Sequence, residues 1–414
     1  MQRAFTPQSF ARVLRAGDSR KFDVDLKARR SDVLSAAVAA SETGHTTFSP
    51  VFRTTVKQRI CASIKDYSQV LILRSIAWFV MKRFRVVLKN RDRIVKDVLE
   101  TLSEATPMYI VRRDISSFYE TLPTEKLRER ITNENFVPER IRKYLECYFN
   151  TFRPSNPIGI QRGIGLSSIL AELAMESYDK SIKSIDGVYR YFRYSDDILV
   201  FSFKPPAKLV EELEARLPSG MKFNGGKGSI LSITNSDKKT RRPVSFEYLG
   251  YEYRFDDFCK DKTARRVEVG IPQKKIKRLK TRILRSLQSF KKNGDFGLLY
   301  DRLSFISSNY IVRRRGASVI KTRRTIRSGI FYSYHLCGIY DKSGKSPYAA
   351  NELKALDGFY NSIIKNGSDF AGIMSSAQKE RLLRFSFFKG FAMKMTVRFA
   401  PERVQNIKQA WKNA

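Results

Sequence analysis

The stretch that most constrains the fold is "RYFRYSDDILVFS", residues 190–202, because it places Asp196 and Asp197 side by side between two runs of aromatic and β-branched residues. Such runs favour strands, and the Ser-Asp-Asp segment between them predicts a hairpin with both aspartates at its turn. Paired carboxylates there fit an ordinary polar turn, a dyad that shares a proton, or a cation site. The apolar flanks and the lack of an adjoining histidine or lysine favour the cation site.

A third carboxylate, Asp114, stands near the end of another strand-like run that begins at residue 108. Pro123 and Thr124 start a helix shortly after it. A hard cation needs carboxylates from more than one segment, and two Mg²⁺ ions about 3.5–4 Å apart on such carboxylates carry out in-line phosphoryl transfer. The sequence therefore predicts a cation site that combines Asp114 with the aspartate pair.

Cysteine and histidine usage argues against a different metal. The chain has two histidines and four cysteines, and no two cysteines form a C-x-x-C pair. No zinc constellation is therefore expected, and oxygen ligands must hold any metal. The simplest account of Cys61, Cys147, Cys259 and Cys337 is that they are free, buried thiols in a reducing cytosol.

The charge of the chain points to nucleic acid. Its 414 residues include 78 Lys and Arg against 41 Asp and Glu, a formal net charge of +37. An excess of this size on a globular composition indicates a phosphate backbone as the partner. No uncharged apolar run reaches the roughly 18 residues of a membrane span, so no membrane partner is expected.

The hydrophobic period changes twice along the chain. Residues 1–105 read mostly as helices, residues 106–255 as mixed strands and helices, and residues 256–414 as basic helices. In the middle part, a glycine-rich loop at Gly159–Gly165 precedes a helix predicted from about Ser167. The chemistry is therefore expected in the middle third.

Five segments in this order resemble the motifs of reverse transcriptases: "DISSFYETL", "GLSSILAELAME", "YSDD", "KFNGGKGSI" and "FEYLGY", from Asp114 to Tyr251. The resemblance implies an α+β right-hand polymerase with fingers at 1–105 and an antiparallel-sheet palm at 106–255. An all-α, basic, thumb-like domain at 256–414 would follow. It also implies RNA-directed DNA synthesis from dNTPs with two Mg²⁺ ions, or Mn²⁺ in their place, and a DNA product.

The same resemblance assigns site residues. Asp114 and Asp196 would be the principal metal ligands, with Asp197 as a weaker ligand or a residue that shapes the turn. Tyr119 would lie under the sugar and select deoxynucleotides, while Phe118 beside it would face the core. The remaining candidates for nucleotide binding are Arg162, Gly163, Ser167, Lys227, Lys57 and Arg59. Arg162 departs from the family, which usually has a glutamine there, and this puts ordinary template handling in question.

The C-terminal third supplies candidates for nucleic-acid binding. Its cations occur near aromatic residues, a combination that suits phosphate contact and base stacking. We expect a structured RNA to bind Lys274, Lys275, Arg278, Arg313, Arg314, Arg315, Arg323 and Arg324.

Within the family, the forms "SFYETLPTEKL" and "LSSILAE" resemble bacterial defence-associated reverse transcriptases of the abortive-infection and unknown-group lineages, which are related to retron and group II intron enzymes. That resemblance implies antiphage function in the bacterial cytoplasm with a noncoding RNA as template or scaffold. Two alternatives remain: a template-independent or protein-primed DNA polymerase of the same fold, and a catalytically degenerate RNA-binding scaffold. A homo-oligomer also stays open.

Overall fold

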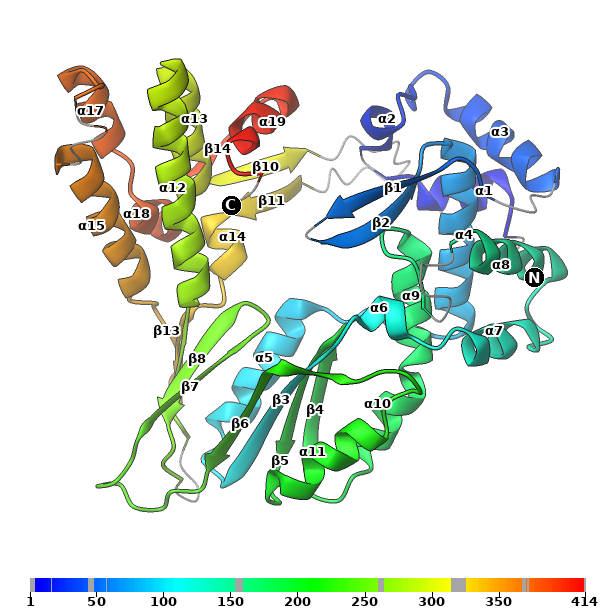
Figure 1. Cartoon of the computed structure of the whole chain (residues 1–414), viewed down its shortest axis with the longest axis horizontal. Coiled ribbons are helices and arrows are strands. Elements are labelled where there is room, and N and C mark those ends of the chain that lie inside the picture. The colour runs from blue at the N-terminus through cyan, green and yellow to red at the C-terminus, as the bar shows by residue number, and fades with distance from the viewer. Residues whose placement is uncertain are drawn as a thin grey trace. The chain divides into compact units, whose positions relative to one another are not determined.

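The computed structural model in Figure 1 describes residues 4–15, 17–43, 48–56, 58–152, 159–259, 264–313, 325–366, 370 and 372–412. The chain folds as two compact units. Among the described residues, unit 1 comprises those within 4–94 and 107–234, and unit 2 those within 95–106, 235–313 and 325–412. The three-part division at 1–105, 106–255 and 256–414 stays a prediction.

Unit 1 combines helices with two antiparallel sheets. Its helices are α1 (Pro7–Val13), α2 (Asp18–Lys21), α3 (Arg30–Glu42), α4 (Tyr67–Arg83), α6 (Phe118–Thr121), α7 (Glu125–Thr132), α8 (Glu139–Thr151), α9 (Gly165–Ala174), α10 (Glu176–Lys183) and α11 (Pro206–Ala215). Its strands are β1 (Val51–Val56), β2 (Arg59–Ile64), β3 (Met108–Ile115), β4 (Val188–Tyr194), β5 (Asp197–Ser202) and β6 (Phe223–Ile233). The helix α5 (Arg91–Ser103) begins in unit 1 and ends in unit 2.

A four-stranded antiparallel sheet carries the three aspartates. Its strand order is β4-β5-β3-β6, and α10 and α11 lie along it (Figure 1). The inner strand β5 is buried from Ile198 to Ser202, and Val111, Ile198 and Val200 join the main hydrophobic core of unit 1. The central position explains why the run that follows Asp197 is almost entirely apolar, since a strand packed on both faces loses the polar alternation.

The antiparallel sheet and the hairpin predicted at residues 190–202 are confirmed, but three details of unit 1 differ from expectation. Residues 51–64, predicted to be mostly helical, form the two-stranded sheet β1-β2. The helix predicted from Ser167 begins at Gly165 and is interrupted at Met175, where α10 follows. The glycine-containing segment "FNGGKGSI" is part of the strand β6, because pairing with β3 outweighs the low strand propensity of glycine.

Unit 2 contains more strand than the sequence predicts. Its helices are α12 (Gln273–Asn293), α13 (Phe296–Ser307), α14 (Ile330–Tyr334), α15 (Asn351–Asn366), α17 (Ser376–Leu383), α18 (Phe387–Ala392) and α19 (Pro401–Gln409). Its strands are β7 (Pro243–Tyr248), β8 (Tyr251–Asp256), β9 (Val267–Gly270), β10 (Asn309–Arg313), β11 (Thr325–Gly329), β12 (Gly338–Asp341), β13 (Gly344–Ser346) and β14 (Thr396–Val397).

The α+β fold class is confirmed, but the prediction that residues 256–414 are all helical was wrong. A five-stranded sheet has the order β13-β12-β9-β8-β7, and a three-stranded sheet has the order β11-β10-β14. The segments are short, and several pair with residues far away in the chain, such as Gly338 with Val269. A local helical period could not reveal such pairing.

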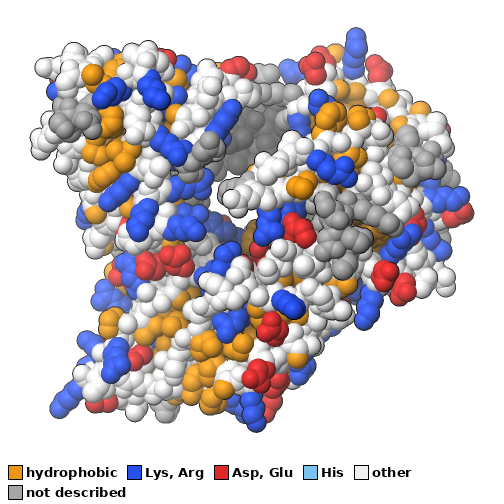
Figure 2. Space-filling model, in the orientation of Figure 1, with side chains coloured by type: hydrophobic (Ala, Val, Ile, Leu, Met, Phe, Trp, Pro, Cys, Tyr) orange, Lys and Arg blue, Asp and Glu red, His pale blue; other side chains and the backbone are white. Residues whose placement is uncertain are grey.

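Basic side chains are spread widely over the face drawn in Figure 2, as the net charge of +37 requires. Cys147, Cys259 and Cys337 are buried thiols, as expected, whereas Cys61 is only partly buried. None of the helices in the described ranges has the length and apolar character of a membrane span.

Candidate active site

The three aspartates come together at the end of the four-stranded sheet of unit 1. Asp114 on β3 is paired in register with Asp197 on β5, and directly opposite residues of antiparallel strands point to the same face. Asp196 lies in the turn between β4 and β5, where the preceding Ser195 has a φ of 58°. The carbonyl of Asp196 accepts a 2.9 Å hydrogen bond from the backbone N–H of Ile115. The β4–β5 turn is therefore fastened to the strand that carries Asp114.

Arg112 lies two residues before Asp114 on the same face of β3 and holds Asp197. Its Nε and Nη2 atoms donate to the two carboxylate oxygens of Asp197 at 3.0 and 3.2 Å. The pair is partly shielded, with side chains 30% and 18% exposed. Asp197 is therefore oriented by a cation of the protein itself, whereas Asp196 has no such bidentate partner among the ion pairs of the described residues.

The electrostatics of the site suit a bound cation. Burial raises the pKa of Asp196 and the charge of Asp114 adds to the rise, while Arg162 and Lys227 oppose it. Burial also raises the pKa of Asp197, the ion pair with Arg112 opposes this, and the other two aspartates add to it. Carboxylates that disfavour one another's ionised form are stabilised by additional positive charge, and hard cations prefer such oxygen ligands. The donor set therefore fits Mg²⁺.

Within the described ranges, however, no three His, Cys, Asp or Glu side chains are grouped closely enough to form a metal site by themselves. The bidentate hold of Arg112 on Asp197 gives a physical reason, since it fixes that carboxylate on a protein cation. The geometry thus sets Asp197 apart from Asp114 and Asp196.

One predicted cation, Lys227, contacts an aspartate, and another, Arg59, contacts the segment that follows Asp114. Lys227 on β6 places its Nζ 3.5 Å from Oδ2 of Asp114. Arg59, at the start of β2, donates from Nη1 to the hydroxyl of Ser117 at 3.0 Å, next to α6. Lys57, the other predicted cation of this hairpin, lies outside the described residues.

The predicted sugar-selecting residue, Tyr119, is next to the turn of the aspartates. Burial raises the pKa of Tyr119, and the side chain of Ser195 opposes this rise. The guanidinium carbon of Arg162 lies 4.8 Å from the centre of its ring. Phe118, also a candidate for nucleotide binding, is 1% exposed and belongs to the core of unit 1, as its expected orientation requires.

The glycine loop packs tightly against β2. The carbonyl of Arg162 accepts from the N–H of Ala62 at 2.7 Å, and the side chain of Gln161 donates to the carbonyl of Ile60 at 2.9 Å. Ser167 differs from its predicted role in nucleotide binding. It is 1% exposed, and its hydroxyl donates to the carbonyl of Gln161 at 2.7 Å. Ser167 therefore stabilises the glycine loop through a buried hydrogen bond to the backbone of Gln161.

Gly163→Ala is expected to lower the free energy of unfolding by about 2 kcal/mol or more. Gly163 has a φ of +99°, and a Cβ atom there would lie 2.3 Å from the carbonyl oxygen of Ala62. Thermal or denaturant unfolding measures the loss. Gly165→Ala is the matched control, because a Cβ at Gly165 would meet only an Arg15 nitrogen at 3.9 Å. Equal stability of the two variants would contradict the prediction.

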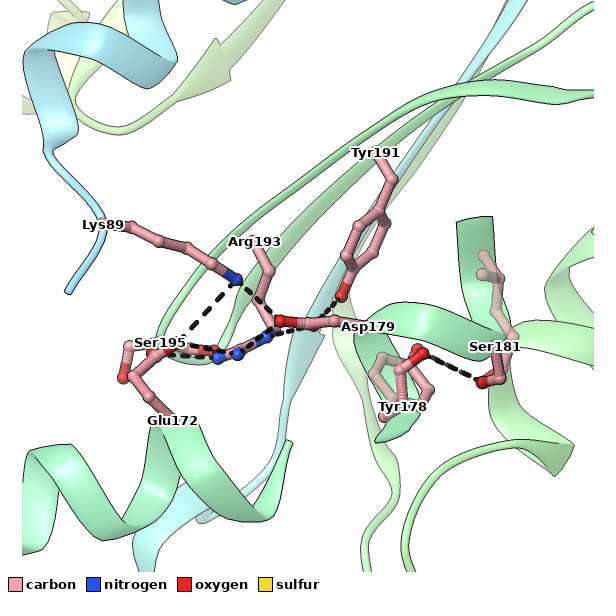
Figure 3. A network of polar contacts seen from close by, with 9 residues as sticks. Lys89, Glu172, Tyr178, Asp179, Ser181, Tyr191, Arg193 and Ser195 are labelled. Atoms are coloured by element: carbon pink, nitrogen blue, oxygen red, sulfur yellow. Dashed lines mark hydrogen bonds and ion pairs between the residues drawn. The ribbon is translucent and has the colours of Figure 1, made fainter. Parts of the chain in front are cut away.

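A buried ion network supports the β4–β5 turn from behind. Arg193 on β4 has a fully buried side chain between Glu172 and Asp179 (Figure 3). Its five N–H groups make five hydrogen bonds: two to Glu172 at 2.8 and 3.1 Å, two to Asp179 at 2.7 and 2.8 Å, and one to the carbonyl of Ser195 at 3.1 Å. Lys89 adds a 2.8 Å hydrogen bond to Asp179. The network thereby fixes the residue that precedes Asp196.

Sequence reasoning missed Arg112, Glu120 and the network of Arg193. One signal was available for Arg193, because an arginine inside a strand that packs on helices must find carboxylates or carbonyls. Glu172 and Asp179 are seven residues apart within the stretch predicted as one helix, and in a continuous helix that spacing would place them on one face. Nothing in the sequence singles out Glu120, whose carboxylate holds Arg162.

The predicted nucleic-acid surface is described only in part. Lys274 and Arg278 are exposed and Lys275 is half-buried on α12, as a basic helix predicts. Arg313 is the last residue of β10, and the description does not extend to its side chain. The remaining four candidates, Arg314, Arg315, Arg323 and Arg324, lie outside the described residues.

Comparisons with known proteins agree with the motifs. Residues 58–253 match the family model described as reverse transcriptase (RNA-dependent DNA polymerase). Among solved structures, the chain is similar to apo telomerase from Candida tropicalis truncated from its C-terminal domain (12% identity, TM-score 0.34), with 53% of this chain and 57% of that one covered. It is also similar to telomerase from Candida albicans in complex with the TWJ fragment of telomeric RNA (13% identity, TM-score 0.34), with 82% and 53% covered.

The chain thus spans little more than half the length of either telomerase chain. No curated protein matches it. The family match covers β2, the glycine loop, β3 with Asp114, the β4–β5 hairpin with Asp196 and Asp197, and the start of β8. Residues 58–253, a little under half of the chain, therefore match the family of reverse transcriptases, which are RNA-dependent DNA polymerases.

Proposed function

We propose that this chain synthesises DNA on an RNA template by a two-metal mechanism at Asp114 and Asp196. The observation that carries the proposal is the convergence of Asp114, Asp196 and Asp197 from two segments at one end of the sheet. When bound, two Mg²⁺ ions would activate the primer 3′-hydroxyl and stabilise the departing pyrophosphate. Mn²⁺ is the alternative ion, since it prefers the same oxygen ligands.

In this proposal the residues of the chain divide the work. Asp114 and Asp196 would hold the ions, and Asp197 would stay on Arg112 and keep the turn in shape. Lys227, 3.5 Å from Asp114, supplies a positive charge beside the leaving phosphates, and Arg59 supplies another from the β1-β2 hairpin. These cations balance the charge of a triphosphate where three carboxylates would repel it.

The direct test is incorporation of dNTPs on a primed RNA template with Mg²⁺, Mn²⁺ or EDTA. We expect template-dependent extension that EDTA abolishes. Extension without a template, or product attached to the protein, would support a template-independent or protein-primed polymerase instead. RNA binding with no incorporation under any condition would support a catalytically degenerate scaffold.

Tyr119→Val is expected to raise the use of ribonucleotides relative to deoxynucleotides by about tenfold or more, since a contact of a few kcal/mol separates the two sugars. Tyr119 is half-buried beside the turn of the aspartates, where a ribose 2′-hydroxyl would meet its ring. The ratio of kcat/KM for a matched rNTP and dNTP measures the effect. A ratio that does not change would remove Tyr119 from the sugar-selecting role.

We further propose that the template is a structured noncoding RNA bound by the basic residues of unit 2, and that the chain acts in antiphage defence in the bacterial cytoplasm. The exposed cations of α12 and the motif forms of the defence-associated lineage support this. Sequencing the RNA that co-purifies from the native host tests it. We expect one RNA to dominate the sequences that co-purify with the protein, both from phage-challenged cells and from unchallenged cells. A random sample of cellular RNA would contradict a dedicated template.

A further inference from the structure

Arg162 is held over Tyr119 by an ion pair. Nε and Nη2 of Arg162 donate to the two carboxylate oxygens of Glu120 at 2.6 and 3.1 Å. The side chains of Arg162 and Glu120 are 24% and 26% exposed, so the pair is shielded on most sides. Burial would raise the pKa of Glu120, but Arg162 lowers it below its usual value, and the pair is charged at neutral pH. A two-pronged pair of this kind fixes the plane of the guanidinium as well as its position.

The backbone on both sides of this pair is fixed as well. The N–H of Ile160 donates to the carbonyl of Tyr119 at 2.7 Å, and a Cβ atom at Gly159 would lie 2.2 Å from the carbonyl oxygen of Glu120. The loop therefore lies directly on the segment that contains Tyr119 and Glu120. The hydrogen bond from Ala62 to the carbonyl of Arg162 secures its other side. The backbone that carries each partner of the ion pair is therefore held in place.

The ring of Tyr119 is consequently restrained from two directions. The guanidinium carbon of Arg162 lies 4.8 Å from its centre, and Phe118 makes an edge-on contact with 5.2 Å between ring centres. A steric selector discriminates only if the selecting group cannot move aside, because the difference between the two sugars is a single hydroxyl. A cation over the ring adds attraction that is lost when the ring turns away.

We propose that Glu120 and Arg162 are positioning residues for sugar selection: the ion pair holds the guanidinium over Tyr119 and keeps its ring in the selecting position. This inference rests on the proposed role of Tyr119. The substrate class concerned is the incoming nucleoside triphosphate, and the property that the pair sets is the preference for deoxyribose over ribose.

Glu120→Gln is the informative change, because it keeps the size of the side chain but removes the charge that fixes Arg162. We expect the rNTP/dNTP ratio of kcat/KM to rise about fivefold or more, with kcat/KM for the dNTP within about twofold of wild type. Arg162→Lys, which lacks the planar fork, should raise the ratio in the same direction. The double exchange Glu120→Arg with Arg162→Glu restores an ion pair but leaves no cation over the ring, so the ratio should stay raised.

Glu146→Gln is the matched control. It removes the carboxylate from another two-pronged pair, with Arg128 on α7, which makes no contact with Tyr119. Its ratio should equal that of wild type. Thermal unfolding of every variant checks that the fold persists.

Outcomes separate this inference from the role of Tyr119 itself. If Tyr119→Val raises the ratio and Glu120→Gln does not, the positioning role is wrong. If Glu120→Gln lowers both kcat/KM values in parallel, the pair is only structural, and the inference is equally wrong. If Tyr119→Val leaves the ratio unchanged, Tyr119 does not select the sugar, and the inference loses the role on which it rests. In the Tyr119→Val background, Glu120→Gln should have no further effect on the ratio, because the restrained ring is gone.

Discussion

Exchanging Asp196 and Asp197 together for asparagine is expected to reduce DNA synthesis by roughly a thousandfold or more. The exchange keeps the size and most hydrogen bonds of both side chains but removes two of the three negative charges at the end of the sheet. Without them the site would hold cations too weakly to stabilise the charge that develops in phosphoryl transfer. Primer extension on an RNA template measures the loss, and a binding assay with the same RNA should give an unchanged Kd.

The chain offers a matched control in a second pair of adjacent aspartates, Asp256 and Asp257 at the end of β8 in unit 2. Their double exchange for asparagine alters the net charge by the same amount. We expect it to leave the extension rate within about twofold, because long-range charge effects on an exposed site are screened over roughly 8–10 Å. Similar losses in the two double variants would mean that net charge, and not a metal site, explains the effect.

Arg193→Met is expected to lower the free energy of unfolding by about 3–5 kcal/mol. Methionine fills part of the volume but leaves the carboxylates of Glu172 and Asp179 buried with only Lys89 to balance them. Denaturant unfolding measures the change. Arg190→Met on the same strand is the control, since Arg190 is exposed and its guanidinium donates to the carbonyl of the adjacent Tyr189. A loss no larger than that of the control would contradict the importance of the network.

The same network makes stability sensitive to acid. Burial alone would raise the pKa of Asp179, but Arg193 and Lys89 outweigh it and lower the pKa to about 2. Because the folded-state pKa lies below the usual 3.8, the stabilisation is complete above about pH 5 and is lost as pH falls toward 2, a change of about 2–3 kcal/mol. In Arg193→Met this contribution is absent. The gap in stability between wild type and variant should therefore narrow as pH falls from 5 to 3.

Local patterns explain what could be predicted. The β4–β5 hairpin follows from two apolar runs around a polar turn, and the strand before Asp114 from a short β-rich run. The basic helix α12 follows from its apolar period, with Ile276, Ile283 and Leu287 on the buried side. The order of the motifs was then enough to predict that the three aspartates form one site, although the strand order of the sheet was not known.

Contacts between distant residues explain what could not be predicted. The pair of Arg162 and Glu120 joins positions 42 residues apart, and that of Arg112 and Asp197 joins positions 85 apart. Ser167 was predicted to bind the nucleotide because it lies at the start of a helix. Its hydroxyl is instead buried, where it hydrogen-bonds to the hydroxyl of Tyr148 on α8 and donates to the carbonyl of Gln161. The strand β9 of unit 2 pairs with β12, about 70 residues away in the chain, although β7 and β8 form a local hairpin. Residue type alone does not specify any of these partners.

The burial of Arg193 also bears on how the protein should respond to ionic strength. Dissolved ions weaken attractions between groups exposed to water far more than attractions between groups enclosed by protein. The support of the β4–β5 turn involves a fully enclosed guanidinium, whereas the lysines and arginines available to nucleic acid, such as Lys274 and Arg278, face solvent. Added salt is therefore expected to weaken the proposed binding of RNA well before it weakens the support of the three aspartates. A molecule released from RNA at high salt would keep its catalytic turn intact and regain activity on dilution.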